Sequence, residues 1–378
     1  MVPKFNIFPF DNLTKTGDPN MKIENIELYP VEIENEEEFK IATGTSFTTE
    51  NVVIKIESEG KIGWGNGASN GVTEETNESI MRCLKPWKEK LIDKDISIED
   101  IWSDFRKEHP GDPSALAGLD TALHDLHGKI EGKRVFELYD GYEEEGVLTD
   151  RTIGIMDERE TVEHAEDYIE QGFKAIKIKV GLDMESDIER IKAVRETVGS
   201  DIKIWVDANQ GYSVEEAKEF CGRIKGSDIE FVEQPVDEED LEGLKEVTKD
   251  TDLPIVADEA MKDHESAEEI CSNEMADMVN IKLMKCGGLT GGRKIVDVIE
   301  DHGVDAMVGC MLEMEPSLGA AVHLFESSDN IKYADLDGHL LLPDGLSRGL
   351  VFEDGRLWTS DEPGIGVEVV MGKLEQYM

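Results

Sequence analysis

Three acidic residues each follow a short apolar run, and the three runs are consecutive along the chain. Asp207 follows Ile-Lys-Ile-Trp-Val, Glu233 follows Phe-Val, and Asp258 follows Pro-Ile-Val-Ala. Three carboxylates that meet at one place suit a hard cation such as Mg²⁺, with Mn²⁺ as the alternative, and the lack of His or Cys beside them argues against zinc. In a chain with 85 acidic residues they could also be solvated surface acids. Their recurrence at the ends of consecutive runs favours a metal site.

Three lysines lie in similar positions. Lys177 and Lys179 stand two residues apart in Ala-Ile-Lys-Ile-Lys-Val, so on a strand both side chains point to the same face. Lys282 lies in Val-Asn-Ile-Lys-Leu. A divalent metal and a second ammonium nearby lower the pKa of a lysine toward the range of acid–base catalysis. Lys179 and Lys282 are therefore candidates for an acid and a base on opposite faces of a bound carbon. The alternative is that they form salt bridges with the metal-binding carboxylates.

Together these residue types point to proton transfer at a carbon next to a carboxylate. Such a proton is very weakly acidic, and its removal leaves a doubly charged enediolate. A metal ion that chelates the substrate carboxylate stabilises this charge, and an ammonium such as that of Lys177 adds to the effect. One base on each face removes the proton on one side and returns it on the other. The prediction is a racemase or epimerase acting on a small-molecule carboxylate.

The elements that must position these residues are visible in the spacing. Apolar runs end at or just before seven residues that recur at steps of 28, 26, 25, 24, 28 and 25: Lys179, Asp207, Glu233, Asp258, Lys282, Cys310 and Asp335. A strand, a helix and their two loops need about that many residues. With residues 152–156 as a further strand, eight runs are enough to close a parallel barrel. A doubly wound open sheet is the alternative, but no glycine-rich phosphate turn follows the first strand.

In such a barrel the carboxyl ends of the strands face one opening, where active sites form. That opening would collect the three carboxylates, the three lysines and four further polar residues. Asn209 and Glu259 lie beside metal ligands and are expected to support them without binding the ion. Asp335 and Asp337 follow the last apolar run.

The first 145 residues have a different character. Residues 21–34 and 50–65 alternate apolar with polar positions, as half-buried strands do, and Gly60 between two strand-like runs predicts a hairpin. Residues 74–92 and 114–130 have helical spacing. This part of the chain is therefore expected to be α+β.

The composition excludes some classes of binding partner. With 39 basic against 85 acidic residues the formal net charge is −46, which repels nucleic acid and anionic membranes. The acids are spread along the chain and predict a hydrated surface suited to the salt-rich cytoplasm of a halophile; an ordinary acidic enzyme is the alternative. Five widely spaced cysteines without C-x-x-C fit reduced thiols. No apolar stretch has membrane-spanning length, and residues 1–20 lack the core of a signal peptide.

Over residues 21–378 the sequence resembles the enolase superfamily, in its muconate-lactonizing-enzyme subgroup. The resemblance rests on Lys-Ile-Lys at 177–179, Asp-Ala-Asn at 207–209, Val-Glu-Gln-Pro at 232–235, Ala-Asp-Glu at 257–259, Asn-Ile-Lys-Leu at 280–283 and a C-terminal Pro-Gly-Ile-Gly. It implies an α/β fold, a modified (β/α)7β TIM-like barrel under an α+β capping domain. It also implies one Mg²⁺ per subunit on Asp207, Glu233 and Asp258, with Lys179 and Lys282 as the acid–base pair.

The resemblance also divides the chain. Residues 1–20 would be an N-terminal extension, residues 21–145 the capping domain, and residues 146–340 the barrel with the metal and catalytic site. Residues 341–378 would return to the capping domain. A homo-oligomer is expected.

Within the subgroup the sequence looks most like the dipeptide epimerases of the L-Ala-D/L-Glu type. In that family two aspartates on the last strand bind the free α-ammonium of the dipeptide, and Asp335 and Asp337 match them. Residues at i and i+2 of a strand point one way and can grip one cation. The run Gly-Cys-Met-Leu-Glu resembles the strand that lines the family's substrate pocket, which makes candidate contacts of Cys310, Met311 and Leu312.

Two positions depart from that family. Residues 39–45 align with the loop that covers the substrate side chain, where members acting on Ala-Glu carry an arginine. Gly44 stands near that place and argues against Ala-Glu as the substrate, and Asn66 replaces a family glutamate. The alternative activities in the same fold are o-succinylbenzoate synthase, N-acylamino acid racemase and muconate cycloisomerase, whose substrates would make paired aspartates an odd choice. A barrel without catalysis is the other alternative; the presence of both lysines and all three ligands argues against it.

Overall fold

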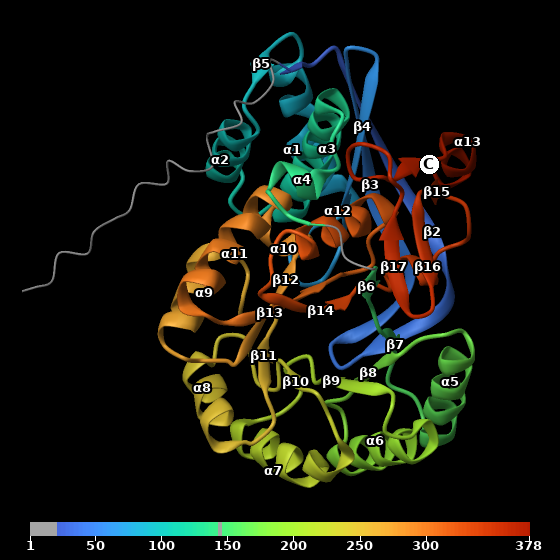
Figure 1. Cartoon of the computed structure of the whole chain (residues 1–378), viewed down its shortest axis with the longest axis vertical. Coiled ribbons are helices and arrows are strands. Elements are labelled where there is room, and N and C mark those ends of the chain that lie inside the picture. Colours follow the sequence, from blue (N-terminus) through green and yellow to red (C-terminus); the bar gives the residue numbers. More distant parts are fainter. Residues whose placement is uncertain (1–20, 143–145) are drawn as a thin grey trace, which may run out of the picture.

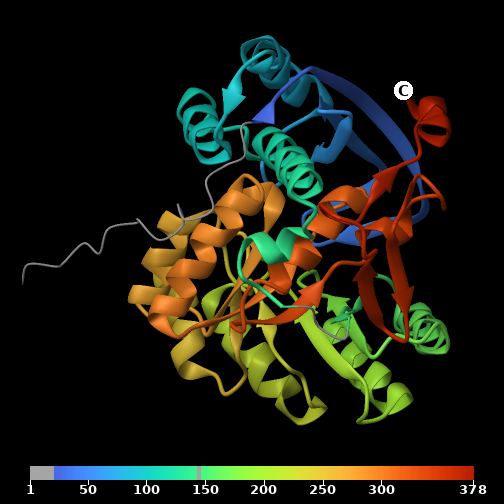
Figure 2. The ribbon, with the colours of Figure 1, turned by 45° about the horizontal axis from the view of Figure 1, so that its top comes forward.

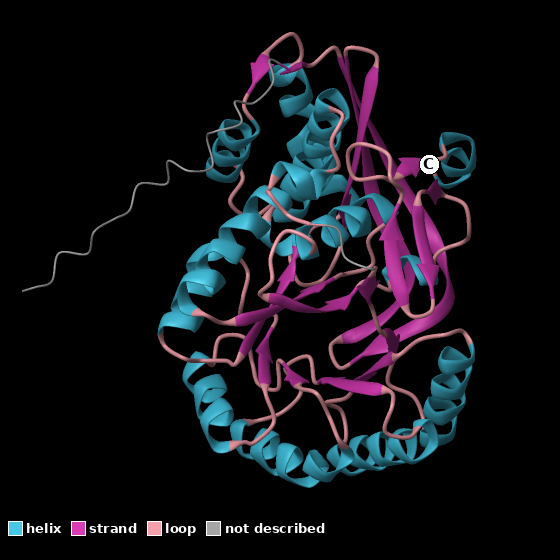
Figure 3. Ribbon diagram, in the orientation of Figure 1, coloured by secondary structure: helices cyan, strands magenta, loops and turns pink. Residues whose placement is uncertain are grey.

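A computed structural model describes residues 21–142 and 146–378; residues 1–20, the expected extension, lie outside this range. An α+β capping domain lies above a parallel barrel, and the last strands of the chain lie beside both (Figures 1 and 3). Within the described residues no helix combines the length and the apolar character needed to cross a membrane.

The capping domain is built on three long antiparallel strands: β2 (Asn25–Ile41), β3 (Gly44–Ser58) and β4 (Lys61–Ala68). Ser58 pairs with Lys61 across a turn formed by Glu59 and Gly60, both with positive φ. The hairpin predicted at Gly60 is therefore confirmed.

Three helices and a short strand pair complete this domain (Figure 2). The helices are α1 (Asn77–Leu91), α2 (Ile98–Glu108) and α3 (Pro113–Glu131), and β1 (Met21–Lys22) pairs with β5 (Asp95–Ile96). Helices α1 and α3 fall on the two predicted helical ranges, whereas α2 has no predicted counterpart. A short helix, α4 (Val135–Leu138), follows α3.

Helix α3 lies directly against β4 because β4 carries glycine where the helix crosses it. A Cβ at Gly63 would lie 2.2 Å from the backbone oxygen of Ala122, and one at Gly65 would lie 2.2 Å from that of Gly118. No side chain fits between the two backbones at these places. This close contact sets the position of α3, whose apolar side chains form one cluster with those of α1 and α2.

Eight parallel strands form the barrel, and they follow the order of the chain. They are β7 (Arg151–Ile153), β8 (Ala175–Lys179), β9 (Lys203–Asp207), β10 (Val232–Glu233), β11 (Ile255–Ala257), β12 (Met278–Lys282), β13 (Asp305–Gly309) and β14 (Ile331–Asp335). A parallel bridge between Thr149 and Ala334 joins β14 to the segment before β7 and closes the ring. Each strand overlaps one of the eight predicted runs. The barrel is therefore confirmed, and the open sheet is excluded.

Helices connect the strands on the outside of the barrel (Figure 3). They are α5 (Glu158–Glu170), α6 (Met184–Val198), α7 (Val214–Ile224), α8 (Leu241–Asp250), α9 (His264–Ser272), α10 (Leu283–Cys286), α11 (Leu289–His302) and α12 (Glu315–Phe325). A 3-10 turn (Gly338–Leu341) follows β14 instead of an α-helix, which agrees with the predicted (β/α)7β pattern. Inside the ring, Trp205, Phe231, Met278 and Met307 pack together below the strand ends and form the floor of the site.

The last residues of the chain return to the capping domain (Figure 2). β15 (Ser347–Arg348) pairs with β18 (Glu368–Val369), while β16 (Leu350–Glu353) and β17 (Arg356–Thr359) form a sheet with β6 (Val147–Leu148). The segment ends in α13 (Met371–Leu374), which a 3-10 turn (Glu375–Tyr377) follows. Its side chains share an apolar cluster with strands β2 to β4 of the cap, with Val31, Val53, Trp64, Val369 and Leu374 among the members.

One feature of the cap differs from the expectation. Residues 39–45 were expected to be a loop, but they form the paired end of the β2–β3 hairpin, where Ile41 lies opposite Gly44. The register of the pairing shifts between Glu34 and Phe39. The carbonyl of Lys40 accepts a hydrogen bond of 2.8 Å from the backbone N–H of Ile155, so the hairpin rests on the barrel just after β7.

Candidate active site

The three carboxylates predicted to bind a metal lie side by side at the carboxyl ends of neighbouring strands. Asp207 ends β9 and is in register with Glu233, which ends β10, and Asp258 directly follows β11. Their side chains are buried, and one carboxylate oxygen of each lies within 4.8 Å of the other two. Strands in parallel register bring these side chains to one level, so a regular spacing in the sequence becomes one cluster in space.

The cluster fits a hard divalent cation. Its donors are oxygens only, as Mg²⁺ prefers. Burial, together with the charge of Asp207, raises the pKa of Glu233 to about 8. Three buried carboxylates at such short range therefore need positive charge among them, which a divalent ion and the nearby lysines can supply.

Two lysines flank the cluster from different sides. Lys179 ends β8, and its Nζ lies 2.7 Å from Asp207; Lys282 ends β12, and its Nζ lies 2.7 Å from Asp258. Both lysines are less than a tenth exposed. Three strands separate β8 from β12 in the ring, so the two ammonium groups approach the cluster from different directions. This geometry suits an acid–base pair, and it also contains the salt bridges that the sequence left open as the alternative.

The pKa of Lys282 moves in the direction opposite to the expectation. Burial favours the neutral form of this lysine, but the charges of Asp258, Glu233 and Glu259 together outweigh burial and raise the pKa. Asp258 contributes most of the three, because it forms a direct ion pair with Lys282. The expected lowering depends on a divalent cation that shares the charge of Asp258.

Lys177 connects the metal cluster to the predicted ammonium-binding residues. It is buried, and its Nζ lies 3.1 Å from Asp207, 2.7 Å from Glu233 and 2.7 Å from Asp335. Burial disfavours its charge, but the carboxylates around it, Asp335 first, raise its pKa well above the ordinary value. Lys177 is therefore a buried positive charge held between the metal cluster and Asp335.

Asp335 and Asp337 lie together on one side of the barrel opening. Asp335 ends β14, and Asp337 accepts a hydrogen bond of 2.8 Å from the backbone N–H of Thr152 and lies 3.4 Å from the guanidinium of Arg151. Cys310, directly after β13, has its sulfur within 4.8 Å of a carboxylate oxygen of each aspartate. The structure thus brings these three predicted residues into one group next to Lys177.

Of the other predicted substrate contacts, Met311 and Leu312 lie in the turn after β13, whereas Gly44 lies in the cap. Met311 donates a backbone hydrogen bond to the buried Glu313, and the carbonyl of Leu312 accepts one of 3.2 Å from Asn51 on strand β3 of the cap. This turn is therefore held between barrel and cap, next to Cys310. Gly44 is exposed at the end of the β2–β3 hairpin, where a Cβ would meet no atom within 4 Å.

Asn209 and Glu259 bind each other beside the metal ligands. The backbone N–H of Asn209 donates to Asp207 (2.9 Å), and its side-chain amide donates to Glu259 (3.1 Å). Burial and the charge of Asp258 raise the pKa of Glu259 to about 7. The pair orients the loop ends on which two of the three carboxylates stand.

Asn66 joins the two domains. Its Oδ1 accepts a hydrogen bond of 3.1 Å from the backbone N–H of Ser317 on α12, and its amide donates to Asn51 (2.7 Å). Because Asn51 in turn donates to Leu312, a chain of polar contacts runs from β4 through the cap to the turn after β13.

Sequence reasoning missed Lys285, a buried lysine on α10. Its Nζ lies 2.5 Å from a carboxylate oxygen of Asp258, so this ligand is shared between Lys285 and Lys282. The available signal was the spacing Lys-Leu-Met-Lys, which places the second lysine one helical turn beyond the first.

Sequence reasoning also missed Asp150, which precedes β7. It is fully buried, and neither carboxylate oxygen has a hydrogen-bond partner on another described residue. The negative charges of Asp335 and Asp337 act on it and, after burial, raise its pKa well above the ordinary value. Nothing in the sequence indicates that the preceding Thr149 bridges to Ala334 and so brings this acid beside the last strand.

Known proteins share this fold. Residues 160–373 match the family described as enolase C-terminal domain-like, and residues 25–139 match the N-terminal domain of the mandelate racemase / muconate lactonizing enzyme family. The chain is 36% identical to an L-Ala-D/L-Glu epimerase of Bacillus subtilis, over 94% of this chain and 100% of that protein. It is 34% identical to an N-succinyl-L-Arg/Lys racemase of Bacillus cereus, over 94% of this chain and 98% of that protein.

A solved structure is similar over nearly the same range. The crystal structure of a dipeptide epimerase from Enterococcus faecalis, complexed with Mg and the dipeptide L-Leu-L-Tyr, is 35% identical and has a TM-score of 0.88. The match covers 92% of this chain and 100% of that one. The chain belongs to the mandelate racemase / muconate lactonizing enzyme family of the enolase superfamily.

Proposed function

We propose that the protein is an isomerase that epimerises a dipeptide at the α-carbon next to its terminal carboxylate, with one Mg²⁺ held by Asp207, Glu233 and Asp258. The observation that carries this proposal is the placement of Lys179 and Lys282. Each lies 2.7 Å from one of the three carboxylates, and they come from strands on different sides of the cluster.

Each lysine acts on one face of the substrate α-carbon. A carbon held above the carboxylates lies between β8 and β12, so Lys179 can take the α-proton from one face while Lys282 delivers a proton to the other. The reverse reaction exchanges their roles. Mg²⁺, when bound, supplies positive charge beside the substrate carboxylate as its α-carbon loses the proton. Lys177 adds a fixed positive charge between the metal ligands and Asp335.

The acidic side of the opening supports a substrate with a free amine. Asp150, Asp335 and Asp337 place three carboxylates there, and the cations that face them are Lys177 and Arg151. A substrate ammonium would add the positive charge that this group lacks, through charge-assisted hydrogen bonds to the two aspartates at the strand end.

A substrate with an acylated amine is the second candidate, because a relative acts on N-succinyl-L-Arg/Lys. The acylated nitrogen carries no charge and would leave Asp335 and Asp337 facing a neutral group. The carboxylate pair therefore favours the dipeptide.

Substitution of the aspartates separates the two candidates. For the wild type we expect a free dipeptide to be a much better substrate than its N-acetylated form. Asp335→Asn and Asp337→Asn should each lower kcat/KM for the free dipeptide by about tenfold or more, which corresponds to about 1.4 kcal/mol. Each should therefore also reduce the ratio of kcat/KM between the free and the acetylated dipeptide. Asp305→Asn, at the exposed opposite end of β13, is the control. Equal kcat/KM for free and acetylated substrates in the wild type would contradict the proposal.

Three further expectations accompany this proposal. Gly44 provides no cation for a C-terminal glutamate, so we expect Ala-Glu to be a poor substrate. The net charge of −46 supports a salt-rich cytoplasm as the working environment, and a homo-oligomer is the expected assembly of this family.

A further inference from the structure

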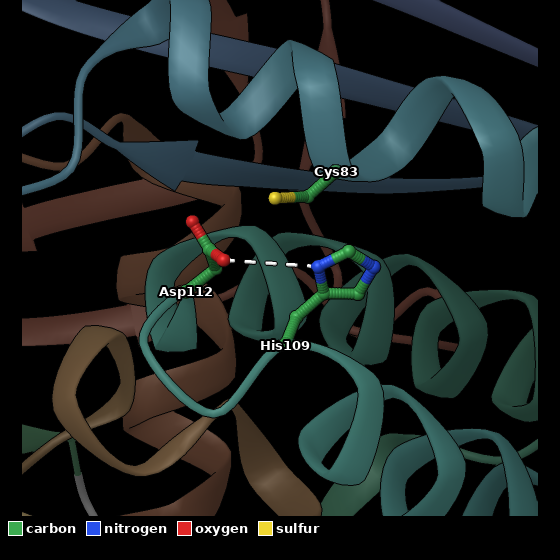
Figure 4. Close-up of side chains that lie close together, drawn as sticks. All are labelled: Cys83, His109 and Asp112. Carbon is green, nitrogen blue, oxygen red and sulfur yellow. Dashed lines mark ion pairs between the residues drawn. The ribbon is translucent and has the colours of Figure 1, made fainter.

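A second group of metal-binding residue types lies in the capping domain, outside the active site. Cys83 lies on α1, His109 directly follows α2, and Asp112 directly precedes α3. One ligand atom of each residue, a sulfur, a nitrogen and an oxygen, lies within 4.8 Å of the other two. Figure 4 shows Cys83 reaching from α1 toward His109 and Asp112, which stand on the turn between α2 and α3.

The three atoms are of the kinds that zinc binds. Zinc takes Cys, His and carboxylate ligands in a tetrahedron with bonds of about 2.0–2.3 Å, so its ligand atoms lie roughly 3.3–3.8 Å from one another. Nδ1 of His109 lies 3.8 Å from a carboxylate oxygen of Asp112. Small side-chain movements would therefore close the three ligands around one ion.

Asp112 does not make the hydrogen bond that is usual for its position at the start of α3. It is the N-cap residue of α3, but it makes no capping hydrogen bond. Glu75 takes that role, because its carboxylate accepts hydrogen bonds from the backbone N–H groups of Ser114 (2.7 Å) and Ala115 (3.0 Å). The carboxylate of Asp112 is thus released from the usual task of an N-cap aspartate and faces Cys83 and His109 (Figure 4).

The group is held in place and is open on one side. Cys83 is 3% exposed, whereas the side chains of His109 and Asp112 are 25% and 21% exposed. The imidazole packs against Phe105 in a tilted arrangement, with 4.9 Å between ring centroids and 43° between the ring planes. A cavity of about 260 Å³, lined in part by His109, Pro110 and Gly111, borders the turn. It leaves space beside His109.

We propose that Cys83, His109 and Asp112 form a zinc site in which a water molecule is the fourth ligand and the ion ties α1 to the turn between α2 and α3. The site is independent of the proposed epimerisation. It differs in kind from the carboxylate cluster of the barrel, which offers oxygen donors only.

Cobalt(II) is the probe that separates this site from the barrel site. A thiolate bound to Co²⁺ gives a charge-transfer band in the near ultraviolet, and oxygen ligands alone do not. In the full-length enzyme saturated with Mg²⁺, we expect one equivalent of Co²⁺ to produce the band and Zn²⁺ to remove it by displacement. Cys83→Ser should abolish the band, whereas Cys271→Ser, which alters a buried thiol on α9, should keep it.

A second variant keeps the test open if Cys83→Ser does not fold. Asp112→Asn changes a partly exposed side chain that caps nothing, and it should weaken Co²⁺ binding by about tenfold or more, since even residues that only support a ligand contribute that much. Zn²⁺ should also raise the Tm of the wild type more than that of Asp112→Asn. Absence of the band in the wild type, or a band of undiminished strength in Cys83→Ser, would overturn the proposal.

Discussion

Both candidate catalytic lysines share a carboxylate with another ammonium group. Lys282 shares Asp258 with Lys285, whose Nζ lies 2.5 Å from it, and Lys179 shares its carboxylate with Lys177. The second ammonium takes part of the carboxylate's charge, so the ion pair holds the first lysine less firmly than an isolated pair would. In the proposed two-base reaction, this sharing would ease the exchange of a proton between each buried lysine and the substrate.

Removing either lysine should therefore stop epimerisation but not all exchange. In Lys179→Ala and Lys282→Ala we expect epimerisation to fall by about 10²–10⁴-fold or more, because a general acid–base contributes that much. Each variant should still exchange the α-proton of the one epimer that faces the remaining lysine, as followed by NMR in D₂O. Lys249→Ala, which alters an exposed lysine on α8, is the control. Epimerisation near the wild-type rate in either active-site variant would contradict the two-base assignment.

Residues at strand ends could be predicted, and residues placed by irregular segments could not. Asp207, Glu233 and Asp258 stand at the ends of regular parallel strands. Their spacing in the sequence was therefore enough to predict that they lie close together. Asp150 reaches the site through a single bridge outside the regular strands, and Gly44 is placed by the length of a hairpin. Neither the length of a hairpin nor a single bridge between two residues produces a periodic pattern in the sequence.

At the scale of elements, the contact between α3 and β4 should tolerate no added side chain. A Cβ at Gly65 would lie 2.2 Å from the backbone oxygen of Gly118 and 2.7 Å from the backbone nitrogen of Ala122, so Gly65→Ala must push helix and strand apart. We expect a loss of about 1–3 kcal/mol or more in the free energy of unfolding, as for overpacked cores. Urea denaturation followed by circular dichroism measures it. Gly71→Ala, with open space around it, should change stability by less than about 0.5 kcal/mol; equal effects of the two substitutions would refute this account.

The cap of α3 should make stability depend on pH. Burial raises the pKa of Glu75 from its ordinary value of 4.5 to about 7 in the folded protein, although hydrogen bonds from Ser114 and Ala115 oppose the shift. Between these two values the unfolded chain loses the proton and the folded chain keeps it, so stability should fall as pH rises from 4.5 to 7 and then level off. The full effect is at most about 3 kcal/mol. Urea denaturation over this pH range measures the free energy of unfolding of the wild type and of Glu75→Gln. If the difference between these two free energies does not change with pH, the raised pKa of Glu75 is contradicted.

The barrel could be predicted element by element, while the cap could be predicted only in part. Every barrel strand is a short apolar run because both of its faces are buried, and the strand–helix unit repeats seven times before the last strand. In the cap, α2 and the outer half of the β2–β3 hairpin escaped prediction. Their positions depend on contacts with other elements, such as the hydrogen bond between Lys40 and Ile155, rather than on their own patterns.

At the scale of the whole molecule, the net charge of −46 opposes compact folding through self-repulsion. Screening reaches about 10 Å at 0.1 M salt but only about 3 Å at 1 M, so added salt weakens this repulsion. We expect the Tm to rise steadily as KCl increases from about 0.1 M to above about 1 M. An equal osmolality of sucrose is the control for solvent exclusion. A Tm that stays level or falls over this range would show that the acidic surface is not adapted to salt.

The central claim is that this barrel moves the proton next to the terminal carboxylate of a dipeptide, and proton exchange tests it most directly. A panel of L,L and L,D dipeptides is incubated in D₂O with the enzyme and Mg²⁺, and the α-proton of the C-terminal residue is followed by NMR. We predict that at least one dipeptide exchanges this proton and forms its diastereomer, and that chelation of Mg²⁺ by EDTA stops both. Absence of exchange in every dipeptide with Mg²⁺ present would contradict the account.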